Sequence, residues 1–359
     1  MSNKKIVVSA GGTGGHIIPA LSVSLQLLKH GGEVSYIGNA DSLEAEIISK
    51  HGIPFYAIKV QKIYRALTLR HFLFPFILIK SIFQCVKYLK QIKPDAFIGF
   101  GGYVSGPPAI AAWLLRIPVH LQEQNCRPGL TNIWTGKFAS KVFIAHEESQ
   151  KYFKGKKAIL TGNPILDNAN TGDVVPHKNI DWQCLYGGRL LLILGGSQGS
   201  LFINNLVLDN LDALLAKGFK IVWQTGKKHL ETIAEKVKNY PNVLTFDFTD
   251  QLHLLYQNAD YVISRGGALC LAEIDVYRLP AFIIPLSTAA VNEQYHNAIA
   301  MQNANKALVM TEKEKDIFID KFDDFLNKAK DMYTDDKPAL HKTAAEKIAF
   351  ILLEKGKEI

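Results

Sequence analysis

Two glycine-rich loops, each directly after a short apolar run, constrain the fold of this chain more than any other feature. The run at 6–10 leads into GGTGGH at 11–16, and the run at 190–194 leads into GGSQGS at 195–200. Each run has the length of a buried parallel strand, and each loop opens an apolar-periodic stretch typical of a helix. Free backbone N–H groups and the helix dipole make such a loop an anion site. Two of them, in separate halves, predict paired nucleotide-type domains that face each other across a cleft.

The rest of the chain alternates between expected strands and expected helices. In the first half, strands are expected at 5–9, 34–37, 55–58, 96–99, 119–122, 142–145 and 158–161, and helices at 17–30, 43–51, 76–92, 107–115 and 130–139. In the second half, strands are expected at 190–194, 220–224, 243–246, 261–264, 281–284 and 307–310, and helices at 201–216, 229–238, 251–257, 269–276, 294–303 and 317–330. This order predicts an α/β fold with a doubly wound parallel sheet in each half.

The domain boundary is expected where GNP at 162–164 precedes a polar, irregular stretch. We therefore predict an N-terminal domain over 1–163 and a C-terminal domain over 164–337. The remaining segment, 338–359, carries a predicted helix at 344–355 that crosses back to the N-terminal domain. A length of 359 residues gives each domain an ample core.

Charge and cysteine usage narrow the class of protein. The chain has 41 Lys and Arg against 33 Asp and Glu, a formal charge of +8, which favours anionic partners such as phosphates, nucleic acid or an anionic membrane. Four scattered cysteines without a C-x-x-C spacing argue against a zinc or redox motif and against a disulfide framework. The first apolar run is too short for a signal peptide, which predicts a cytoplasmic protein.

The segment at 72–83 is unusually apolar. It is interrupted by Pro75 and Lys80 and falls short of the roughly 20 apolar residues of a spanning helix. Lysines and arginines precede and follow it, as in a patch that rests on an anionic leaflet. The candidate patch residues are Phe72, Leu73, Phe74, Phe76, Ile77 and Ile79. From this segment alone, a buried core helix is an equal alternative.

The two glycine loops do not fit the commonest templates. The first lacks the third glycine of G-x-G-x-x-G, and the chain has no P-loop sequence. The second does satisfy G-x-S-x-G, so Ser197 with Asp250 or Asp260 and His296 would form a hydrolase triad. That interpretation leaves the whole first domain and its own glycine loop unexplained.

Further polar loops follow other predicted strands. A third glycine cluster, GFGGYVSGP at 99–107, suits a diphosphate together with the first loop, and EQN at 123–125 suits a sugar. In the second half, Glu273 lies early in a helix after RGG at 265–267, where its carboxylate can accept bonds from two ribose hydroxyls. Without an Asp-x-Asp pair, no metal-bridged diphosphate is expected, and helix N-termini must neutralise the leaving group.

Taken in order, these motifs resemble the MurG family of N-acetylglucosaminyltransferases of bacterial peptidoglycan synthesis, within glycosyltransferase family 28. The resemblance also covers QTG at 224–226 and nearly the whole length. It implies a GT-B fold and an inverting transfer of N-acetylglucosamine from UDP-GlcNAc to the C4 hydroxyl of the muramoyl sugar of undecaprenyl-diphosphate lipid I. No cofactor, metal or nucleic acid is implied. The enzyme would be peripheral on the cytoplasmic face of an anionic membrane, with cell-wall synthesis proteins as possible partners.

The resemblance also implies a role for individual residues. The residues expected to bind the donor are Thr13, Gly14, Gly15, Asn125, Ser197, Gln198, Thr249, Ala268, Leu269, Glu273 and Gln294. The residues expected to cradle the acceptor diphosphate are Gly11, Gly12, Gly101, Gly102 and Tyr103. For the general base, His16 is the first candidate because histidine titrates near neutrality, and Glu123 is the second.

Two departures from the family pattern concern donor binding. The family usually carries an arginine shortly after GNP, where this chain has Ile165, Leu166 and Asp167, so Arg265 becomes the candidate for that charge. Cys270 stands where a small hydroxyl residue is common. The alternative functions are another GT-B lipid glycosyltransferase, such as a diacylglycerol glucosyltransferase, and an inactive sugar-nucleotide-binding protein.

Overall fold

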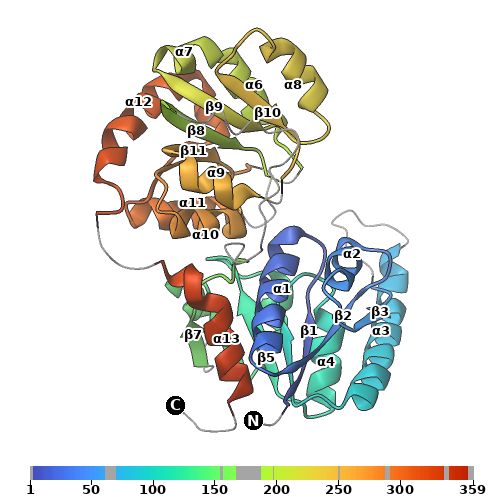
Figure 1. Ribbon diagram of the computed structural model, residues 1–359. Coiled ribbons are helices and arrows are strands. Elements are labelled where there is room, and N and C mark those ends of the chain that lie inside the picture. Colours follow the sequence, from blue (N-terminus) through green and yellow to red (C-terminus); the bar gives the residue numbers. More distant parts are fainter. Residues whose placement is uncertain are drawn as a thin grey trace. The chain divides into compact units, whose positions relative to one another are not determined.

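The computed structural model describes residues 3–60, 70–153, 157–166, 187–196, 198–249, 251–287, 292–334 and 339–354, and side chains within these ranges except those of 70–74 and 157. The chain forms two compact units (Figure 1). Unit 1 comprises 1–166 with 340–359, and unit 2 comprises 167–339.

Unit 1 contains a parallel sheet of seven strands in the order β3-β2-β1-β4-β5-β6-β7. The strands are β1 (Lys5–Ser9), β2 (Glu33–Asn39), β3 (Phe55–Ile58), β4 (Ala96–Gly99), β5 (Val119–Glu123), β6 (Lys141–Ile144) and β7 (Lys157–Leu160). Its helices are α1 (Gly14–Lys29), α2 (Leu43–Ser49), α3 (Arg70–Ile92), α4 (Gly106–Leu114), α5 (Leu130–Thr135) and α13 (Ala344–Leu353), with 3-10 turns η1 (Glu147–Tyr152) and η6 (Leu340–Thr343). The strand order reverses beside β1, which places a topological switch point at the carboxyl ends of β1 and β4.

Unit 2 repeats this plan with six strands in the order β10-β9-β8-β11-β12-β13. The strands are β8 (Arg189–Leu194), β9 (Phe219–Gln224), β10 (Val243–Phe246), β11 (Tyr261–Ser264), β12 (Ala281–Ile283) and β13 (Ala307–Val309). Its helical elements are α6 (Leu201–Asp209), α7 (Leu211–Ala216), α8 (Leu230–Val237), α9 (Leu252–Asn258), α10 (Ala268–Val276), α11 (Glu293–Asn303), η4 (Glu312–Ile317), α12 (Phe318–Lys328) and η5 (Ala329–Asp331). The α/β class with two doubly wound parallel sheets, predicted from the sequence, is confirmed.

Helices cover both faces of each sheet (Figure 1), so the middle of β1 (6–8) and most of β8 (190–194) are apolar and buried. Helix α13, drawn in red, packs on α1 of unit 1. Its Ile348, Ala349 and Leu352 join the core that lies under β1 and β2. The Lys4 ammonium donates to the Leu352 carbonyl oxygen over 3.1 Å, so the C-terminal segment belongs to unit 1.

Several helix boundaries differ from expectation: α1 begins at Gly14 rather than 17, and α3 begins at Arg70 rather than 76. The single helix expected at 201–216 is α6 followed by α7, because Asn210 leaves helical geometry (φ −119°, ψ 15°) and its amide donates to the Leu206 carbonyl. Helix α5 ends at Thr135 rather than 139. No helix among the described residues is both long and apolar enough to cross a bilayer.

Candidate active site

The first and third glycine loops are in direct contact within unit 1. They leave the adjacent strands β1 and β4, whose last residues, Ser9 and Gly99, are partners in the sheet. Gly102 has a φ of +75°, and a Cβ atom there would lie 2.3 Å from the Gly11 carbonyl oxygen. A Cβ at Gly11 would in turn lie 2.6 Å from the Glu44 carboxylate. Only glycine fits this close approach, so the residue types define the shape of the site.

The two loops differ in the backbone donors that they offer. Helix α1 begins at Gly14 with Thr13 as its N-cap, and the Thr13 side chain makes no capping bond. Its first turn carries no acidic residue, which leaves N–H groups for an anion. Helix α4 instead has Pro107 and Pro108 in its first turn, and proline has no N–H. An anion at this edge of the sheet is therefore better served by α1 than by α4.

His16 lies at the junction of these loops. Its ring carbon Cε1 and Nδ1 would each lie 3.4 Å from a Cβ at Gly101, so the glycine makes room for the ring. The Gln124 amide donates to the Phe100 carbonyl oxygen over 2.7 Å, which fixes Gln124 Oε1 as an acceptor 3.2 Å from His16 Nδ1. This orientation of Gln124 assigns the proton of the neutral ring to Nδ1, which makes Nε2 the basic nitrogen. Burial lowers the pKa of His16, which keeps the ring neutral near pH 7.

Glu123 is buried, and its carboxylate is committed to four donors. Oε1 accepts from the backbone and side-chain nitrogens of Asn125, over 2.9 and 3.1 Å. Oε2 accepts from the Gly129 N–H over 3.3 Å and from the Asn132 amide over 2.8 Å. The carboxylate thus holds the 123–132 loop, including Asn125, in place. Of the two candidates for the general base, this arrangement favours His16 and gives Glu123 a positioning role.

The burial of Glu123 predicts a pH-dependent stability. Desolvation raises its pKa to about 7, above its usual value near 4.5. A carboxyl with a raised pKa stabilises the fold fully below about pH 4.5 and loses that contribution as the pH rises through about 7. The difference corresponds to about 3 kcal/mol. We therefore expect the thermal midpoint of Glu123→Gln to rise relative to that of the wild type as the pH increases from 5 to 8. A constant difference between the two midpoints over this range would contradict the prediction.

The second glycine loop of the chain packs on QTG at 224–226 in unit 2. Gly199 has a φ of +74°, and a Cβ there would lie 2.3 Å from the Thr225 carbonyl oxygen. Gly226, with a φ of +82°, would place a Cβ 2.5 Å from the Gly199 Cα. Gln198 is exposed on this loop, and Ser197 lies outside the described residues. The two glycine motifs of the C-terminal half therefore form one loop pair.

Arg265 holds this loop to the neighbouring elements. Its guanidinium donates to the hydroxyl of Ser200, the N-cap of α6, over 2.6 and 3.1 Å. It also donates to the Ile284 carbonyl oxygen and pairs with the Glu312 carboxylate at 2.7 Å. The side chain is buried, and its charge is already matched by Glu312. Arg265 is thus built to position the 195–200 loop, and the structure gives no support to its replacing the family arginine.

Glu273 lies in the second turn of α10, which follows the glycine turn at 266–267. The Tyr256 hydroxyl donates to its Oε2 over 3.2 Å and orients the carboxylate. Burial raises the pKa of Glu273 to about 7. The N-cap of α10, Gly267, offers no side-chain oxygen, so the first-turn N–H groups at Ala268 and Leu269 are available to a ligand. Cys270 lies beside Glu273, with its sulfur 3.2 Å from the Ser264 hydroxyl.

The remaining predicted donor residues border the same edge of the unit 2 sheet. Gln294, in the first turn of α11, accepts the Leu286 N–H over 3.0 Å through its Oε1. A Cβ at Gly266 would lie 2.3 Å from the Gln294 carbonyl oxygen, so α11 and the α10 turn are in contact. Thr249 is buried, and its hydroxyl accepts the Gln251 N–H over 3.0 Å. Its backbone therefore lies at the start of α9, after β10.

The hydrolase alternative finds no support among the described residues. The Asp260 carboxylate accepts the Leu190 N–H over 2.6 Å, at the amino ends of β11 and β8. The glycine loop that carries Ser197 leaves the carboxyl end of β8, at the opposite edge of the sheet. Asp260 is thus unable to serve a triad there, and Asp250 lies outside the described residues.

The apolar segment forms part of α3, with some of its described side chains exposed and others turned to the core. Phe76 is 72 %, Ile79 52 % and Phe83 71 % exposed, whereas Ile77 is half-buried. Phe72, Leu73 and Phe74 lie outside the residues whose side chains are described. Helix α4 packs on α3 and also on α5. Helices α4 and α5 add exposed apolar side chains that were not predicted from the sequence. These are Trp113, Leu114, Leu130 and Trp134.

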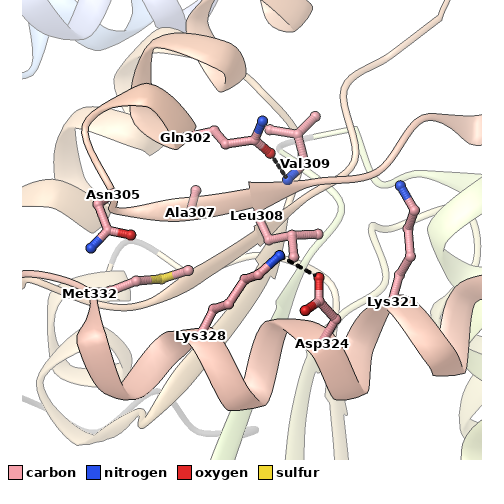
Figure 2. A pocket seen from close by; sticks show the side chains of 9 residues that line it. All are labelled: Gln302, Asn305, Ala307, Leu308, Val309, Lys321, Asp324, Lys328 and Met332. Carbon is pink, nitrogen blue, oxygen red and sulfur yellow. Dashed lines mark hydrogen bonds and ion pairs between the residues drawn. The ribbon is translucent and has the colours of Figure 1, made fainter.

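A separate pocket of about 420 Å³ lies at the edge strand of unit 2, between β13 and α12 (Figure 2). It contains none of the glycine loops. Two of its lysines are paired with carboxylates: Lys328 with Asp324 at 2.7 Å and Lys321 with Glu314 at 2.5 Å. The Val309 N–H is satisfied by Gln302 over 2.8 Å. Because its charges are matched, this pocket has no group poised for a phosphate or sugar.

Comparison with known proteins gives the same picture over both halves. The models of the glycosyltransferase family 28 N-terminal and C-terminal domains match residues 6–144 and 190–349. A UDP-N-acetylglucosamine–N-acetylmuramyl-(pentapeptide) pyrophosphoryl-undecaprenol N-acetylglucosamine transferase of Flavobacterium psychrophilum is 35% identical over 319 residues, 88% of this chain and 87% of that protein. The Clostridium botulinum protein of the same name is 37% identical over 315 residues, 87% of each.

Solved structures agree with this assignment. The crystal structure of Acinetobacter baumannii MurG superimposes with a TM-score of 0.75 at 27% identity, covering 97% of this chain and 98% of that one. A UDP-GlcNAc 2-epimerase from Neisseria meningitidis shares the fold, with a TM-score of 0.68 at 18% identity over 98% of this chain and 99% of that one. The predicted GT-B class is confirmed. With its two matched domains and its relatives above 30% identity, the chain is a member of glycosyltransferase family 28.

Proposed function

We propose that this enzyme transfers N-acetylglucosamine from UDP-GlcNAc to the C4 hydroxyl of the muramoyl sugar of lipid I, an undecaprenyl-diphosphate lipid. The names of the curated relatives describe this transfer. The observation that carries the proposal is the junction of the glycine loops at 11–15 and 99–106, with the neutral His16 beside it. Such a junction offers an anion cradle and a proton acceptor within one unit.

In the proposed reaction, the acceptor oxygen attacks C1 of the donor sugar while the bond from C1 to the UDP oxygen breaks. The proton of the attacking hydroxyl passes to His16 Nε2, the basic nitrogen of the tautomer that the bond from Nδ1 to Gln124 assigns. Attack opposite the leaving group inverts C1. Backbone N–H groups at helix N-termini stabilise the negative charge on the departing diphosphate.

We assign the acceptor diphosphate to unit 1 and the nucleotide to unit 2. Gly11, Gly12, Gly101, Gly102 and Tyr103 would cradle the diphosphate, with Thr13, Gly14, Gly15 and Asn125 turned to the donor sugar. In unit 2, Glu273 would accept the ribose hydroxyls, and the backbone at Thr249 would read uracil. Ser197, Gln198, Ala268, Leu269 and Gln294 would complete the contacts to the diphosphate and sugar.

The exposed apolar side chains of α3, α4 and α5 support docking to a membrane that contains the lipid acceptor. Lys80 and Lys87 are exposed on α3, and the Lys137 ammonium lies 4.5 Å from the centre of the exposed Trp134 ring. Apolar side chains with adjacent lysines suit the interface of an anionic leaflet. We therefore place the enzyme at the cytoplasmic face of the membrane, where cell-wall synthesis proteins would be its neighbours.

The decisive test is the release of UDP from UDP-GlcNAc by the purified protein, with and without a short-chain lipid I analogue. We expect release that depends on the analogue and persists in EDTA. A parallel reaction offers diacylglycerol as the acceptor. UDP release with diacylglycerol but not with the lipid I analogue would contradict this proposal and indicate a diacylglycerol glycosyltransferase instead. Donor binding without release on either acceptor would indicate a protein that has lost its chemistry.

A further inference from the structure

Three side chains with metal-binding chemistry meet in unit 1, none of them assigned above to the transfer reaction. They are Cys126, His146 and Glu148, and their ligand atoms all lie within 4.8 Å of one another. Cys126 is buried, His146 is half-buried and Glu148 is exposed. The lack of a C-x-x-C spacing argues against zinc in the sequence, but these ligands come from two separate loops that the fold brings together.

The sheet explains why the three side chains meet. Cys126 follows β5 and His146 follows β6, which are neighbouring parallel strands with Glu123 paired to Ile144. The Ala145 N–H donates to the Glu123 carbonyl over 3.0 Å and extends that pairing to the base of both loops. Glu148 lies in the first turn of η1, for which His146 is the N-cap. Both loops therefore leave the same edge of the sheet side by side.

Each loop is held by contacts of its own. The Glu123 carboxylate bonds to Asn125 on one side of Cys126 and to Gly129 on the other. The His146 carbonyl accepts the N–H of the buried Ser149 over 3.1 Å. The His341 ring lies 6.3 Å from the His146 ring, centre to centre, and bounds it from the side of η6. Loops fixed in this way bring their ligands to a cation with little loss of entropy.

We infer that Cys126, His146 and Glu148 bind one divalent cation of borderline softness, such as Zn²⁺, with a fourth position left for water. Thiolate, imidazole and carboxylate are the donor types that Zn²⁺ takes in tetrahedral sites. Tetrahedral ligand atoms lie about 3.5 Å apart, so side-chain shifts of about 1 Å complete the geometry. The bound ion would tie the loop that carries Asn125 to η1.

Thiolate is the form of cysteine that ligates a metal, so each ion bound should release the thiol proton of Cys126 to the solvent.

The test uses Co²⁺ as a spectroscopic probe and Zn²⁺ as a competitor on the full-length, metal-stripped protein. All proteins carry Cys184→Ser, which leaves the thiols of Cys85, Cys126 and Cys270. We expect one Co²⁺ per chain, a thiolate-to-cobalt charge-transfer band, and its loss when Zn²⁺ is added. Cys126→Ser should abolish the band and weaken Zn²⁺ binding by more than about a hundredfold, since even loss of an outer-shell partner costs ten- to a hundredfold. The matched thiol variant Cys270→Ser should keep both.

A second measurement is independent of the spectrum. At a hundredfold excess over its Kd, Zn²⁺ should raise the thermal midpoint by about 5 to 10 °C, and Glu148→Gln should reduce that rise. Because Glu148 is exposed, this variant keeps the fold if Cys126→Ser does not. A band that survives Cys126→Ser, or a midpoint that Zn²⁺ leaves unchanged, would overturn the inference. Neither readout uses transferase activity, so the proposed function stands or falls separately.

Discussion

Replacing His16 with alanine is expected to lower kcat by a factor of about 10² to 10⁴, the usual contribution of a positioned general base. The variant removes the only group that we assign to accept the acceptor proton. It removes no backbone donor of the α1 N-terminus, so the KM for UDP-GlcNAc should change little. Steady-state UDP release at saturating donor and acceptor measures the effect.

The neighbour of His16 supplies a graded version of this test. Gln124→Ala keeps the imidazole but removes the acceptor that holds the proton on Nδ1. We expect a smaller fall in kcat, because the tautomer is no longer fixed. The acid limb of the pH profile should shift to lower pH, because the bond to Gln124 raises the pKa of His16 and its loss lowers that pKa further. His51→Ala, at an exposed histidine after α2, is the matched control and should behave as the wild type. A kcat for His16→Ala within twofold of the wild type would remove His16 from the mechanism.

The sheets and the loop contacts were accessible from the sequence because they depend on short-range patterns. Continuous apolar runs such as 190–194 identify strands that are buried on both faces. Glycines directly after neighbouring parallel strands end at one sheet edge, which is why Gly102 and Gly11 meet. The break between α6 and α7 at Asn210 could not be predicted from the sequence. A polar residue inside an apolar-periodic stretch does not indicate that its side-chain amide donates to a backbone carbonyl, here that of Leu206.

What the sequence left open was which polar groups are already satisfied. Glu123 is of a residue type that often acts in catalysis. Its carboxylate, however, already accepts four hydrogen bonds from residues 125–132. Arg265 has the charge that the family places elsewhere, but Glu312 neutralises it across 47 positions. Such pairings depend on tertiary geometry, and the same holds for the exposure of Trp113 and Trp134. Residue type therefore indicates candidate site residues, whereas their partners in the fold decide which roles are open to them.

Replacing Glu273 with glutamine is expected to raise the KM for UDP-GlcNAc by about a hundredfold or more. Two hydrogen bonds from ribose hydroxyls to a carboxylate contribute about 1.5 to 3 kcal/mol each, and the amide retains only a weaker acceptor. Since these bonds are made equally in the ground and transition states, kcat should fall far less than kcat/KM. Isothermal titration with UDP measures the same loss without an acceptor.

The control for Glu273 separates ribose recognition from a general helix-terminus effect. Glu231 lies in the first turn of α8 and is exposed, so its carboxylate interacts with the helix dipole alone. Glu231→Gln should leave UDP affinity unchanged. Glu273 lies in the second turn of α10, beyond the range of the dipole, and it accepts the Tyr256 hydroxyl. Equal UDP affinities for Glu273→Gln and Glu231→Gln would therefore reject the ribose assignment, and with it the placement of the nucleotide on α10.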